Sequence, residues 1–298
     1  MARSYPLEQS DDRTLPADFA GEVLIWDIDK TYLNTHFSTW RGLLAIPFEF
    51  AVDKEAIPGA VPLLRALRHG PGERSRITPL YFVSASPPQL REVIERRMVL
   101  DGVEFDGISF KDQLRLLLGR RPRALREQVG YKLNALLRYR RRHPDGARYL
   151  LFGDDVELDA EIFSLFGEIC AGLRGTPLRR RLRELGAPRG DAEEIGALAD
   201  PLRATACVER IYIHLTRGTD PDRFGQLGEG VVAGDFLTQA VHLAAGGRIR
   251  GSAIAEVARE VIGPDASPPH LEERLGREAE RLKISAARVA ALREELHR

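Results

Sequence analysis

The sequence predicts an α/β fold, in which a parallel sheet carries a small helical insertion and an all-helical C-terminal extension. Short apolar runs typical of buried strands alternate with longer segments whose apolar residues recur at helical spacing. This strand pattern stops between residues 172 and 205, and it does not return after residue 234. Strands that alternate with helices in this way pair in parallel through right-handed crossovers.

The first part of the chain is expected to run from an arm into two strand–helix pairs. Residues 1–22 are polar and contain proline, so we expect them to form the arm. Glu22–Asp27 and Ile77–Ser84 are apolar runs typical of buried parallel strands. Pro58–His69 begins with proline, repeats apolar residues at helical spacing and is followed by glycine, as many helices are. Pro87–Leu100 has one apolar face at the same spacing, which predicts a second helix.

The middle of the chain continues the alternation. Gly107–Phe110 is expected to be a short third strand, and Ala124–Arg142 a long helix. Arg148–Gly153 is another apolar run and predicts a strand, which the helix Leu158–Cys170 follows. Val208–Leu215 is expected to be the last strand. Together these elements define an α/β domain over residues 23–216.

The insertion, at about residues 172–205, is expected to contain the short helices Leu178–Leu185 and Ala192–Leu198. The extension, residues 234–298, is expected to form three helices, Asp235–Ala245, Ser252–Ile262 and Pro269–Arg298.

The last of these helices repeats an apolar residue every seven positions, at Leu275, Leu282, Val289 and Leu296. Such a seam fits a helix docked on its own protein or a coiled coil that joins two copies into a homodimer. Docking is favoured, because the repeat is barely three heptads long.

Composition excludes several classes of protein. The 298 residues include 44 lysines and arginines against 44 aspartates and glutamates, so the formal net charge is zero. A surface devoted to nucleic acid would make the chain basic, and a disordered acidic protein would be strongly negative. The most apolar stretch, Leu43–Val52, is about half of the ~20 residues that cross a bilayer. With no signal-peptide pattern before it and only two cysteines, Cys170 and Cys207, the chain is expected to be cytoplasmic, with both thiols buried.

Polar and acidic side chains follow three of the expected strands. Because the carboxyl ends of parallel strands meet at one edge of a sheet, where α/β proteins bind their ligands, we expect these side chains to meet. Lys132, one of only five lysines, lies in the helix before the last of these strand ends. The strand-end residues are Asp27, Asp29, Thr31, Ser84, Asp154 and Asp155.

These residue types suit phosphoryl transfer. Two carboxylates separated by one residue, Asp27 and Asp29, can point into one crevice while the intervening Ile28 points to the other side. One can attack phosphorus while the other serves as acid and base. Attack on an anionic phosphate requires charge neutralisation, which Mg²⁺ held by oxygen ligands supplies, and Asp154 and Asp155 are placed to complete its shell. Hydroxyl groups and an ammonium, from Thr31, Ser84 and Lys132, can bind phosphate oxygens.

In this order, Asp27-Ile-Asp-Lys-Thr31, Ser84, Lys132 and Gly153-Asp-Asp155 resemble the four motifs of the haloacid-dehalogenase-like (HAD) phosphatase superfamily. Within it, the chain is most similar to the phosphatidate phosphatase catalytic domain of the yeast actin-patch type. That similarity rests on Ile57-Pro-Gly59, Tyr81–Pro87 with Gln89-Leu90, and Ile211–Ile213, and it spans about Val23 to Leu215. It implies a Rossmann-like, HAD-like sheet.

The resemblance also implies a role for each matched residue. Asp27 would be the nucleophile that forms an aspartyl-phosphate, and Asp29 the acid for the leaving group and then the base for water. Ser84 and Lys132, with Thr31, would hold the phosphoryl group. Mg²⁺ would be bound by Asp27, the backbone carbonyl of Asp29 and Asp154, with Asp155 and Asp159 in support.

The chain departs from that lipid-phosphatase pattern at three positions. Lys30 replaces the usual aspartate, Ala85 the usual asparagine, and Asp155 the usual serine. Lys30 adds a cation beside the nucleophile and would either clamp the substrate phosphate or pair with Asp155. No chemically required group is removed, so catalysis is expected while the lipid substrate stays open.

Two further features bear on the substrate. The aromatic segment with Phe37 and Trp40 is either a helix packed over the sheet or an apolar lid that contacts the substrate. The stretch Arg120–Arg142 holds nine cations and one glutamate. It is either a solvated helix face or a surface that attracts an anionic membrane or, ranked lower, a nucleic-acid end.

The preferred hypothesis is a Mg²⁺-dependent phosphomonoester hydrolase whose substrate is phosphatidate, another phospholipid or a phosphorylated small molecule. A phosphatase of nucleotides or nucleic-acid ends is a rival within enzymes. A non-catalytic scaffold that binds a partner through its C-terminal helices is a rival from another class.

Overall fold

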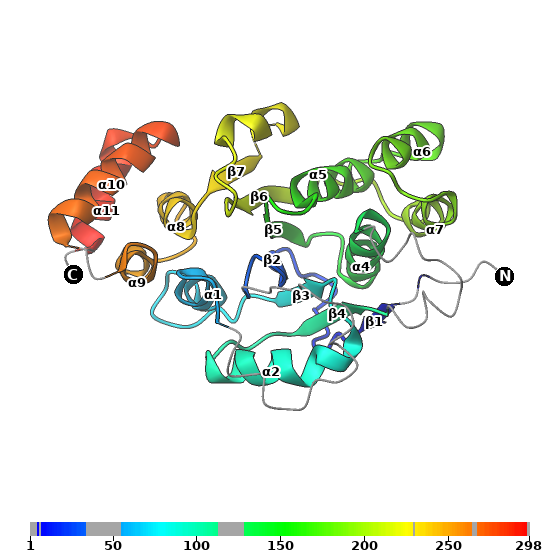
Figure 1. Ribbon diagram of the computed structural model, residues 1–298, viewed down its shortest axis with the longest axis horizontal. Coiled ribbons are helices and arrows are strands. Elements are labelled where there is room, and N and C mark those ends of the chain that lie inside the picture. The colour runs from blue at the N-terminus through cyan, green and yellow to red at the C-terminus, as the bar shows by residue number, and fades with distance from the viewer. Residues whose placement is uncertain are drawn as a thin grey trace.

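The computed structural model describes Tyr5 and residues 7–33, 55–112, 128–228, 230–263 and 267–296. These residues form one seven-stranded sheet with helices on both faces (Figure 1), which confirms the expected α/β class. The strands are β1 (Leu7–Gln9), β2 (Glu22–Asp27), β3 (Leu80–Ser84), β4 (Gly107–Lys111), β5 (Arg148–Asp154), β6 (Val208–His214) and β7 (Val231–Gly234). From β4 to β7 every neighbouring pair is parallel, whereas β1 pairs antiparallel with β4.

The order of the strands positions the candidate site. Across the sheet they run β1-β4-β3-β2-β5-β6-β7. From β2 the chain therefore moves outward through β3 and β4, and then returns to build β5, β6 and β7 on the other side. This is the doubly wound order of Rossmann-like folds, in which a crevice opens at the carboxyl ends of the two strands where the direction reverses. Those strands are β2 and β5, which end at Asp27 and Asp154.

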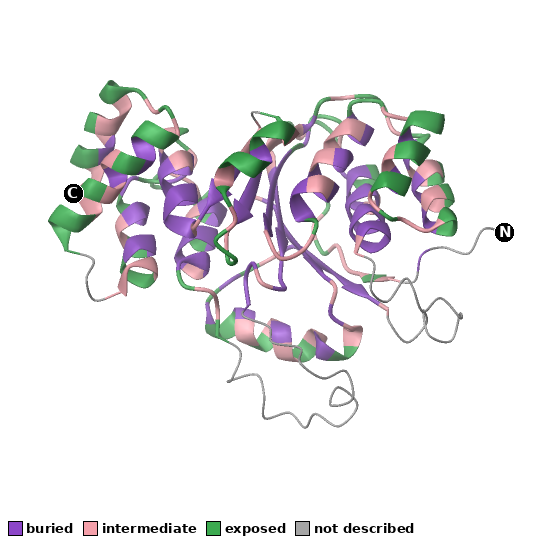
Figure 2. Ribbon diagram, turned by 45° about the horizontal axis from the view of Figure 1, so that its top comes forward, coloured by how far each residue is buried: buried purple, intermediate pink, exposed green. Residues whose placement is uncertain are grey.

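Helices cover both faces of the sheet, with α4 to α7 on one side and α1, α8 and α9 on the other (Figure 1). The first group comprises α4 (Val129–Arg142), α5 (Asp159–Cys170), α6 (Gly175–Glu184) and α7 (Arg189–Ala199). The second comprises α1 (Ala60–His69), α2 (Arg91–Leu100), α8 (Phe236–Ala245), α9 (Ser252–Val261), α10 (Pro268–Arg281) and α11 (Ala286–Leu296). The strands are buried between these layers, while the outer helix faces are exposed (Figure 2).

Each face of the sheet has its own hydrophobic core, and the central strand contributes to both. Val23 and Ile25 lie in the core under α4 to α7, and Leu24 and Trp26 in the core on the opposite face. Successive side chains of a strand point to opposite faces, so a strand covered on both sides needs an unbroken apolar run. This requirement explains the run Glu22–Asp27 that predicted the strand.

The C-terminal helices pack on the same sheet as the rest of the chain. Trp26 of β2 stacks on Phe152 of β5 and on Phe236 of α8, with ring centroids 4.4 and 5.9 Å apart. Leu275 of α10 and Leu292 of α11 are fully buried in that core. Of the expected seam, Leu275 is thus buried, while Leu282 and Leu296 are partly buried against the same core, and α10 and α11 pack on α8, with α11 also on α9.

Five features of the fold differ from the expectation. The first 22 residues include the edge strand β1, and residues after the last expected strand form β7. The single helix expected over Pro269–Arg298 is wrong, because α10 ends at Arg281 and α11 begins at Ala286. Lys283 between them has a φ of 54°, which is left-handed and ends a helix. The helix expected over Pro87–Leu100 begins as a 3₁₀ turn, η2 (Pro88–Leu90), and a second, η4 (Pro221–Leu227), precedes β7.

Among the described residues, no helix combines the length and the apolar character that crossing a bilayer requires.

Candidate active site

A tight loop after β2 carries the first three candidate residues. The amide of Ile28 still bonds to the carbonyl of Val83 on β3, at 3.1 Å, and the chain then turns so that the amide of Leu33 reaches the carbonyl of Ile28 at 2.9 Å. Within this turn Asp27, Asp29 and Thr31 are buried. Lys30 is partly exposed and has a φ of 66°, a left-handed conformation that is uncommon for a long side chain.

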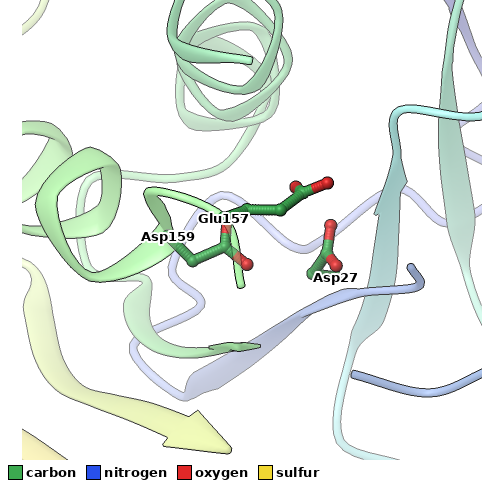
Figure 3. A group of neighbouring side chains, drawn as sticks. All are labelled: Asp27, Glu157 and Asp159. Carbon is green, nitrogen blue, oxygen red and sulfur yellow. The ribbon is translucent and has the colours of Figure 1, made fainter. Parts of the chain in front are cut away.

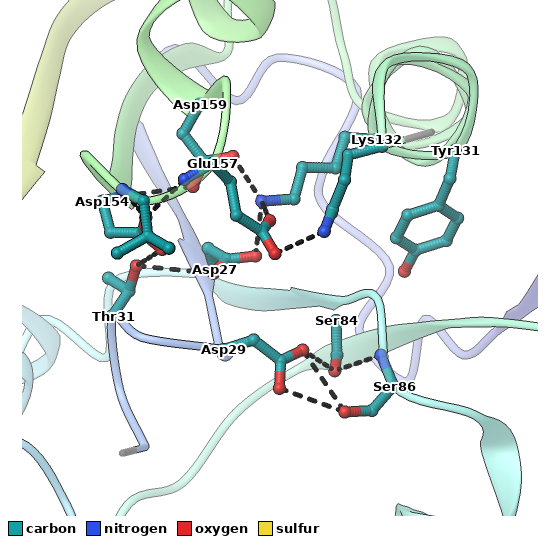
Figure 4. A network of polar contacts seen from close by, with 12 residues as sticks. Asp27, Asp29, Thr31, Ser84, Ser86, Tyr131, Lys132, Asp154, Glu157 and Asp159 are labelled. Carbon is teal, nitrogen blue, oxygen red and sulfur yellow. Dashed lines mark hydrogen bonds and ion pairs between the residues drawn. The ribbon is translucent and has the colours of Figure 1, made fainter. Parts of the chain in front are cut away.

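Lys132 lies at the centre of a group of buried carboxylates. It comes from the first turn of α4, and its side chain is fully buried. Its Nζ is 2.8 Å from Oδ1 of Asp27 and 2.7 Å from Oε2 of Glu157, and it forms a third ion pair with Asp159 (Figure 4). The ammonium thus joins the end of β2 to the loop after β5 and to the start of α5.

The three carboxylates around Lys132 point toward one another (Figure 3), and one oxygen of each lies within 4.8 Å of the others. Such a group can hold a metal ion. Here, however, Nζ of Lys132 contacts all three, so the lysine itself occupies the place where these oxygens converge. A metal ion is therefore better sought among other oxygens of this site.

Those oxygens lie beside Thr31. Its Oγ1 is 3.4 Å from Oδ2 of Asp27 and 3.4 Å from Oδ2 of Asp154, so the two carboxylates face a common point. The other oxygen of Asp154 accepts the backbone amide of Glu157 at 2.9 Å. This turn fixes the carboxylate and leaves Oδ2 directed toward β2.

Asp29 has a different environment from Asp27. Ser84 donates its hydroxyl to Oδ2 of Asp29 at 2.8 Å, and Ser86 donates to Oδ1 at 3.1 Å (Figure 4). Both serines belong to the segment at the end of β3, which is next to β2 in the sheet. One carboxylate of the Asp-x-Asp pair is therefore held by an ammonium and the other by two hydroxyl groups.

The structure brings together Asp27, Asp29, Thr31, Ser84, Lys132, Asp154 and Asp159. Asp155 does not join them. Its carboxylate accepts bonds from the hydroxyl of Thr219 at 2.6 Å and from the amide of Thr216 at 2.8 Å, on the loop after β6. Consecutive residues at a strand end point to opposite sides, and Asp154 takes the inward side. Phe37 and Trp40 lie outside the described residues.

Two site residues were not predicted from the sequence, Glu157 and Ser86. The sequence offered a signal for each. Glu157 lies between Asp154 and Asp159, and Ser86 is two residues after Ser84. Gly153 is also required, since a Cβ there would lie 2.4 Å from Oδ2 of Asp159. A glycine at this position lets α5 begin close enough for Asp159 to reach Lys132.

Burial and mutual repulsion raise the pKa values of the site carboxyls. Burial raises the pKa of Asp27 well above its usual value, and Lys132 offsets this only in part because Asp159 and Glu157 raise it further. Burial, followed by the charge of Asp159, raises the pKa of Asp154 to about 7. For Lys132, burial acts to lower the pKa, but Asp159, Asp27 and Glu157 together raise it well above the usual range. The lysine is therefore charged at neutral pH.

The site holds more carboxyl groups than its own cation can neutralise. If ionised, the carboxylates of Asp27, Asp154, Glu157 and Asp159 leave three negative charges uncompensated around the single ammonium of Lys132. Buried charges of one sign are costly unless a counter-ion is bound. The donor set is entirely oxygen, which is the preference of Mg²⁺, and Oδ2 of Asp27 and of Asp154 face the same point. The residues present thus fit Mg²⁺.

The site is assembled from segments that are far apart in the chain: the loop after β2, the end of β3, the first turn of α4 and the loop after β5. All of them lie at the carboxyl edge of the sheet, around the point where the strand order reverses. Comparison of the chain with models of protein families, with curated proteins and with solved structures finds no match.

Proposed function

We propose that the protein is a Mg²⁺-dependent phosphomonoester hydrolase of the HAD type, which acts through an aspartyl-phosphate on Asp27. The observation that carries the proposal is the unequal pairing of two adjacent carboxylates. Asp27 pairs with the ammonium of Lys132, whereas Asp29 accepts hydroxyl bonds from Ser84 and Ser86. The ammonium of Lys132 can only donate, which favours the ionised form of Asp27 that attacks phosphorus. A serine hydroxyl can donate or accept, so Ser84 and Ser86 are suited to Asp29 both with and without its proton, as an acid–base catalyst requires.

In the first step, a carboxylate oxygen of Asp27 forms a bond to phosphorus and the bond from phosphorus to the ester oxygen breaks. Asp29 gives its proton to that oxygen, so the product leaves as an alcohol. In the second step, Asp29 takes a proton from water, whose oxygen bonds to phosphorus while the bond to Asp27 breaks. Inorganic phosphate and the free carboxylate result, so Asp27 is restored.

Positive charge at the reacting phosphate comes from two sources. Lys132, which is held within the carboxylate group, offsets the charge of the nucleophile. Asp27, Asp154 and the backbone carbonyl of Asp29 would hold Mg²⁺, which when bound neutralises phosphate oxygens. The surplus of buried carboxylates over ammonium groups supports this assignment.

The proposed substrate is the phosphomonoester of a phospholipid or of a small molecule. The resemblance to the phosphatidate phosphatase domain supports a phospholipid, and the phosphate-binding groups of the site are equally suited to a small phosphomonoester.

The decisive experiment measures hydrolysis of an aryl phosphate with Mg²⁺ by the wild type, by Asp27→Asn and by Asp18→Asn. Asp18 is an exposed aspartate outside the site, so its variant makes the same change of charge and serves as the matched control. We expect Asp27→Asn to lose activity on the order of 1,000-fold or more and Asp18→Asn to keep it. Equal rates for the wild type and Asp27→Asn would contradict the proposal and favour a scaffold.

Once activity is established, the substrate class is tested with phosphatidate vesicles, a panel of phosphorylated metabolites and a 5′-phosphorylated oligonucleotide. Faster turnover of the lipid or of a metabolite supports the proposed class. Preferential turnover of the oligonucleotide would replace it with the rival class of nucleic-acid ends.

A further inference from the structure

The C-terminal half of α4 presents three arginines on one face. Arg138, Arg141 and Arg142 are separated by three and four positions of the helix, so their side chains are neighbours on its surface. Arg141 and Arg142 are exposed, while Arg138 is partly buried. They belong to the cationic stretch Arg120–Arg142, of which residues 120–127 lie outside the described residues.

These three arginines line a cavity of about 400 Å³, together with Leu198 near the end of α7. Helices α4 and α7 pack on each other (Figure 1), and the cavity lies at their contact. Arg138 is fixed there, because it donates to the carbonyl of Tyr5 at 3.1 Å and pairs with Glu194 of α7 at 3.4 Å. Pockets that bind small molecules span roughly 300–1,000 Å³, so this cavity has room for one small molecule.

Nearby carboxylates balance the charge of the cavity only in part. Arg142 forms a long ion pair with Asp11, at 3.9 Å. Within the part of the chain that the structure describes, Arg141 forms no ion pair. Other arginines of the surface are closely matched, since carboxylate oxygens lie 2.7, 2.6 and 2.9 Å from Arg91, Arg97 and Arg181. The cavity thus has a local surplus of positive charge in a chain of zero net charge.

A bound anion would relieve the repulsion among these arginines. Burial, followed by the charges of Arg142 and Arg141, lowers the pKa of Arg138 below its usual value. A guanidinium presents its N–H groups in a planar fork that matches the oxygens of a phosphate group. Leu198 adds an apolar wall that suits the carbon part of a ligand. The lining therefore favours a phosphorylated organic molecule.

The cavity lies at the opposite end of α4 from the candidate active site. Lys132 is in the first turn of this helix, and Arg141 follows it by nine residues, which is about 14 Å along the helix axis. After α4 the chain enters β5 at Arg148, on the edge of the sheet opposite to Asp154. A ligand in the cavity is therefore not the molecule that would react at Asp27.

We propose that this cavity binds the phosphate group of a small soluble molecule, as a second site separate from the candidate active site. An anionic membrane or a nucleic acid offers the same phosphate chemistry on an extended surface. From Glu193 to Asp200, however, α7 exposes two carboxylates and no cation, and these would repel such a surface. The inference does not depend on which reaction the candidate active site performs.

The test is a calorimetric titration of the full-length protein with sodium pyrophosphate in a buffer that contains EDTA. Without Mg²⁺, the carboxylates of the candidate active site repel anions, so binding reports on the arginine cavity. We expect saturable binding of one pyrophosphate per chain and a rise in the thermal midpoint with pyrophosphate concentration. Absence of saturable binding would overturn the proposal.

Glutamine variants locate the bound anion. Arg141→Gln and Arg142→Gln should each weaken pyrophosphate binding at least about tenfold, because each removes a hydrogen bond between charged groups. Both residues are exposed, so the fold should persist. Arg183→Gln is the matched control, since Arg183 is an exposed arginine of α6 outside the cavity. Its affinity should stay within about twofold of the wild type, because solvent screens distant charges. Equal weakening in all three variants would show that the anion has no defined site.

Two further measurements distinguish the source of the phosphate. They are co-sedimentation with phosphatidylcholine vesicles that contain phosphatidate and a gel shift with a single-stranded oligonucleotide, each performed in EDTA. The wild type and Arg141→Gln should behave alike in both. Binding to vesicles or to the oligonucleotide that requires Arg141 and is tighter than the binding of pyrophosphate would overturn the assignment of a small soluble ligand.

Discussion

At the residue scale, Lys132, the proposed phosphate ligand, also has a structural role, because its charge holds buried carboxylates together. Its ammonium is in contact with Asp27, Glu157 and Asp159, which come from separate segments. Without it, these carboxylates would repel one another in a site that water scarcely reaches. This structural role distinguishes Lys132 from a residue whose only role would be to bind the substrate.

We therefore expect Lys132→Met to lower the free energy of unfolding by about 3–5 kcal/mol, as does removal of one partner from a buried ion pair. Urea denaturation at pH 7 without added metal measures the change. Lys283→Met is the matched control, since Lys283 is exposed and its variant should differ from the wild type by less than about 0.5 kcal/mol. A Lys132→Met protein as stable as this control would show that the carboxylates do not need the ammonium.

Most of the candidate site could be predicted at this scale from the rule that parallel strands end at one edge. Asp27, Asp29, Ser84 and Asp154 obey it because they end strands or directly follow them. Glu157 was missed although it lies between Asp154 and Asp159 in the sequence, because the direction of its side chain depends on the turn that Asp154 makes with the following amides. Strand alternation places Asp155 on the side opposite Asp154, which the prediction of a metal ligand at both positions overlooked. The partners of Asp155 on the loop after β6 could not be predicted from the sequence.

At the scale of elements, the contact between α4 and α7 shows how the insertion bears on the site. Asp191 near the start of α7 is fully buried against the first turn of α4. A carboxylate in this position suits the partial positive charge of a helix N-terminus. Gly130 permits the approach, because any side chain there would meet Asp191.

Gly130→Ala should lower the free energy of unfolding by about 1–2 kcal/mol, because the clash with Asp191 outweighs the higher helix propensity of alanine. Gly196→Ala is the matched control, since it lies in α7 with open space around the position of a Cβ and should stabilise by roughly 0.5–1 kcal/mol. Chemical denaturation of both variants measures the difference. A Gly130→Ala protein that gains stability like the control would mean that Asp191 moves aside without cost.

The end of α4 predicts a pH dependence of stability. His143 caps this helix, is 6% exposed and bonds through Nδ1 to the hydroxyl of Tyr149 at 3.0 Å. Burial, with the charges of Arg140 and Arg142, lowers its pKa from 6.5 to about 4. Between pH 4 and pH 6.5, His143 binds a proton more tightly in the unfolded chain than in the folded protein. The contribution of neutral His143 to the free energy of unfolding is therefore complete above pH 6.5 and is lost as the pH falls toward 4.

From pH 7 to pH 5, the wild type should therefore lose roughly 2 kcal/mol more of its free energy of unfolding than His143→Gln does. Glutamine keeps a polar group for Tyr149 but does not titrate. His69→Gln, which replaces an exposed histidine, should follow the wild type. Urea denaturation of all three proteins at both pH values decides the matter, and parallel losses in the wild type and His143→Gln would exclude His143 as the source.

Elements with strong periodicity were predicted closely, whereas short or edge elements were not. The expected strand Glu22–Asp27 coincides with β2, because burial on both faces demands an unbroken apolar run. The strand β1 was missed since it has three residues and only one neighbour, β4. The break between α10 and α11 was missed because a non-glycine residue, Lys283, adopts the left-handed conformation there.

At the scale of the whole molecule, the C-terminal helices complete the core on one face of the sheet. Leu275 and Leu292 are buried with residues of β2 and β5, although they are more than 120 positions away in the sequence. Polar contacts strengthen the docking, since Arg274 pairs with Asp235 at 2.7 Å and Arg281 donates to the carbonyl of Ala233 at 3.0 Å. Leu275, the first residue of the heptad pattern, is thus covered by its own chain, and Leu282 and Leu296 are partly covered.

Docking and dimerisation predict different responses to protein concentration. Because Leu275 is already covered within its own chain, Leu275→Ala should lower the free energy of unfolding by about 2–5 kcal/mol, as other large-to-small changes in a core do. The thermal midpoints of the wild type and of this variant should both stay constant over a hundredfold range of concentration, since no partner copy contributes to stability. Leu158→Ala, at a 42% exposed leucine, should change the stability by less than about 1 kcal/mol. A midpoint that rises with concentration in the wild type but not in Leu275→Ala would instead show that the seam joins two copies.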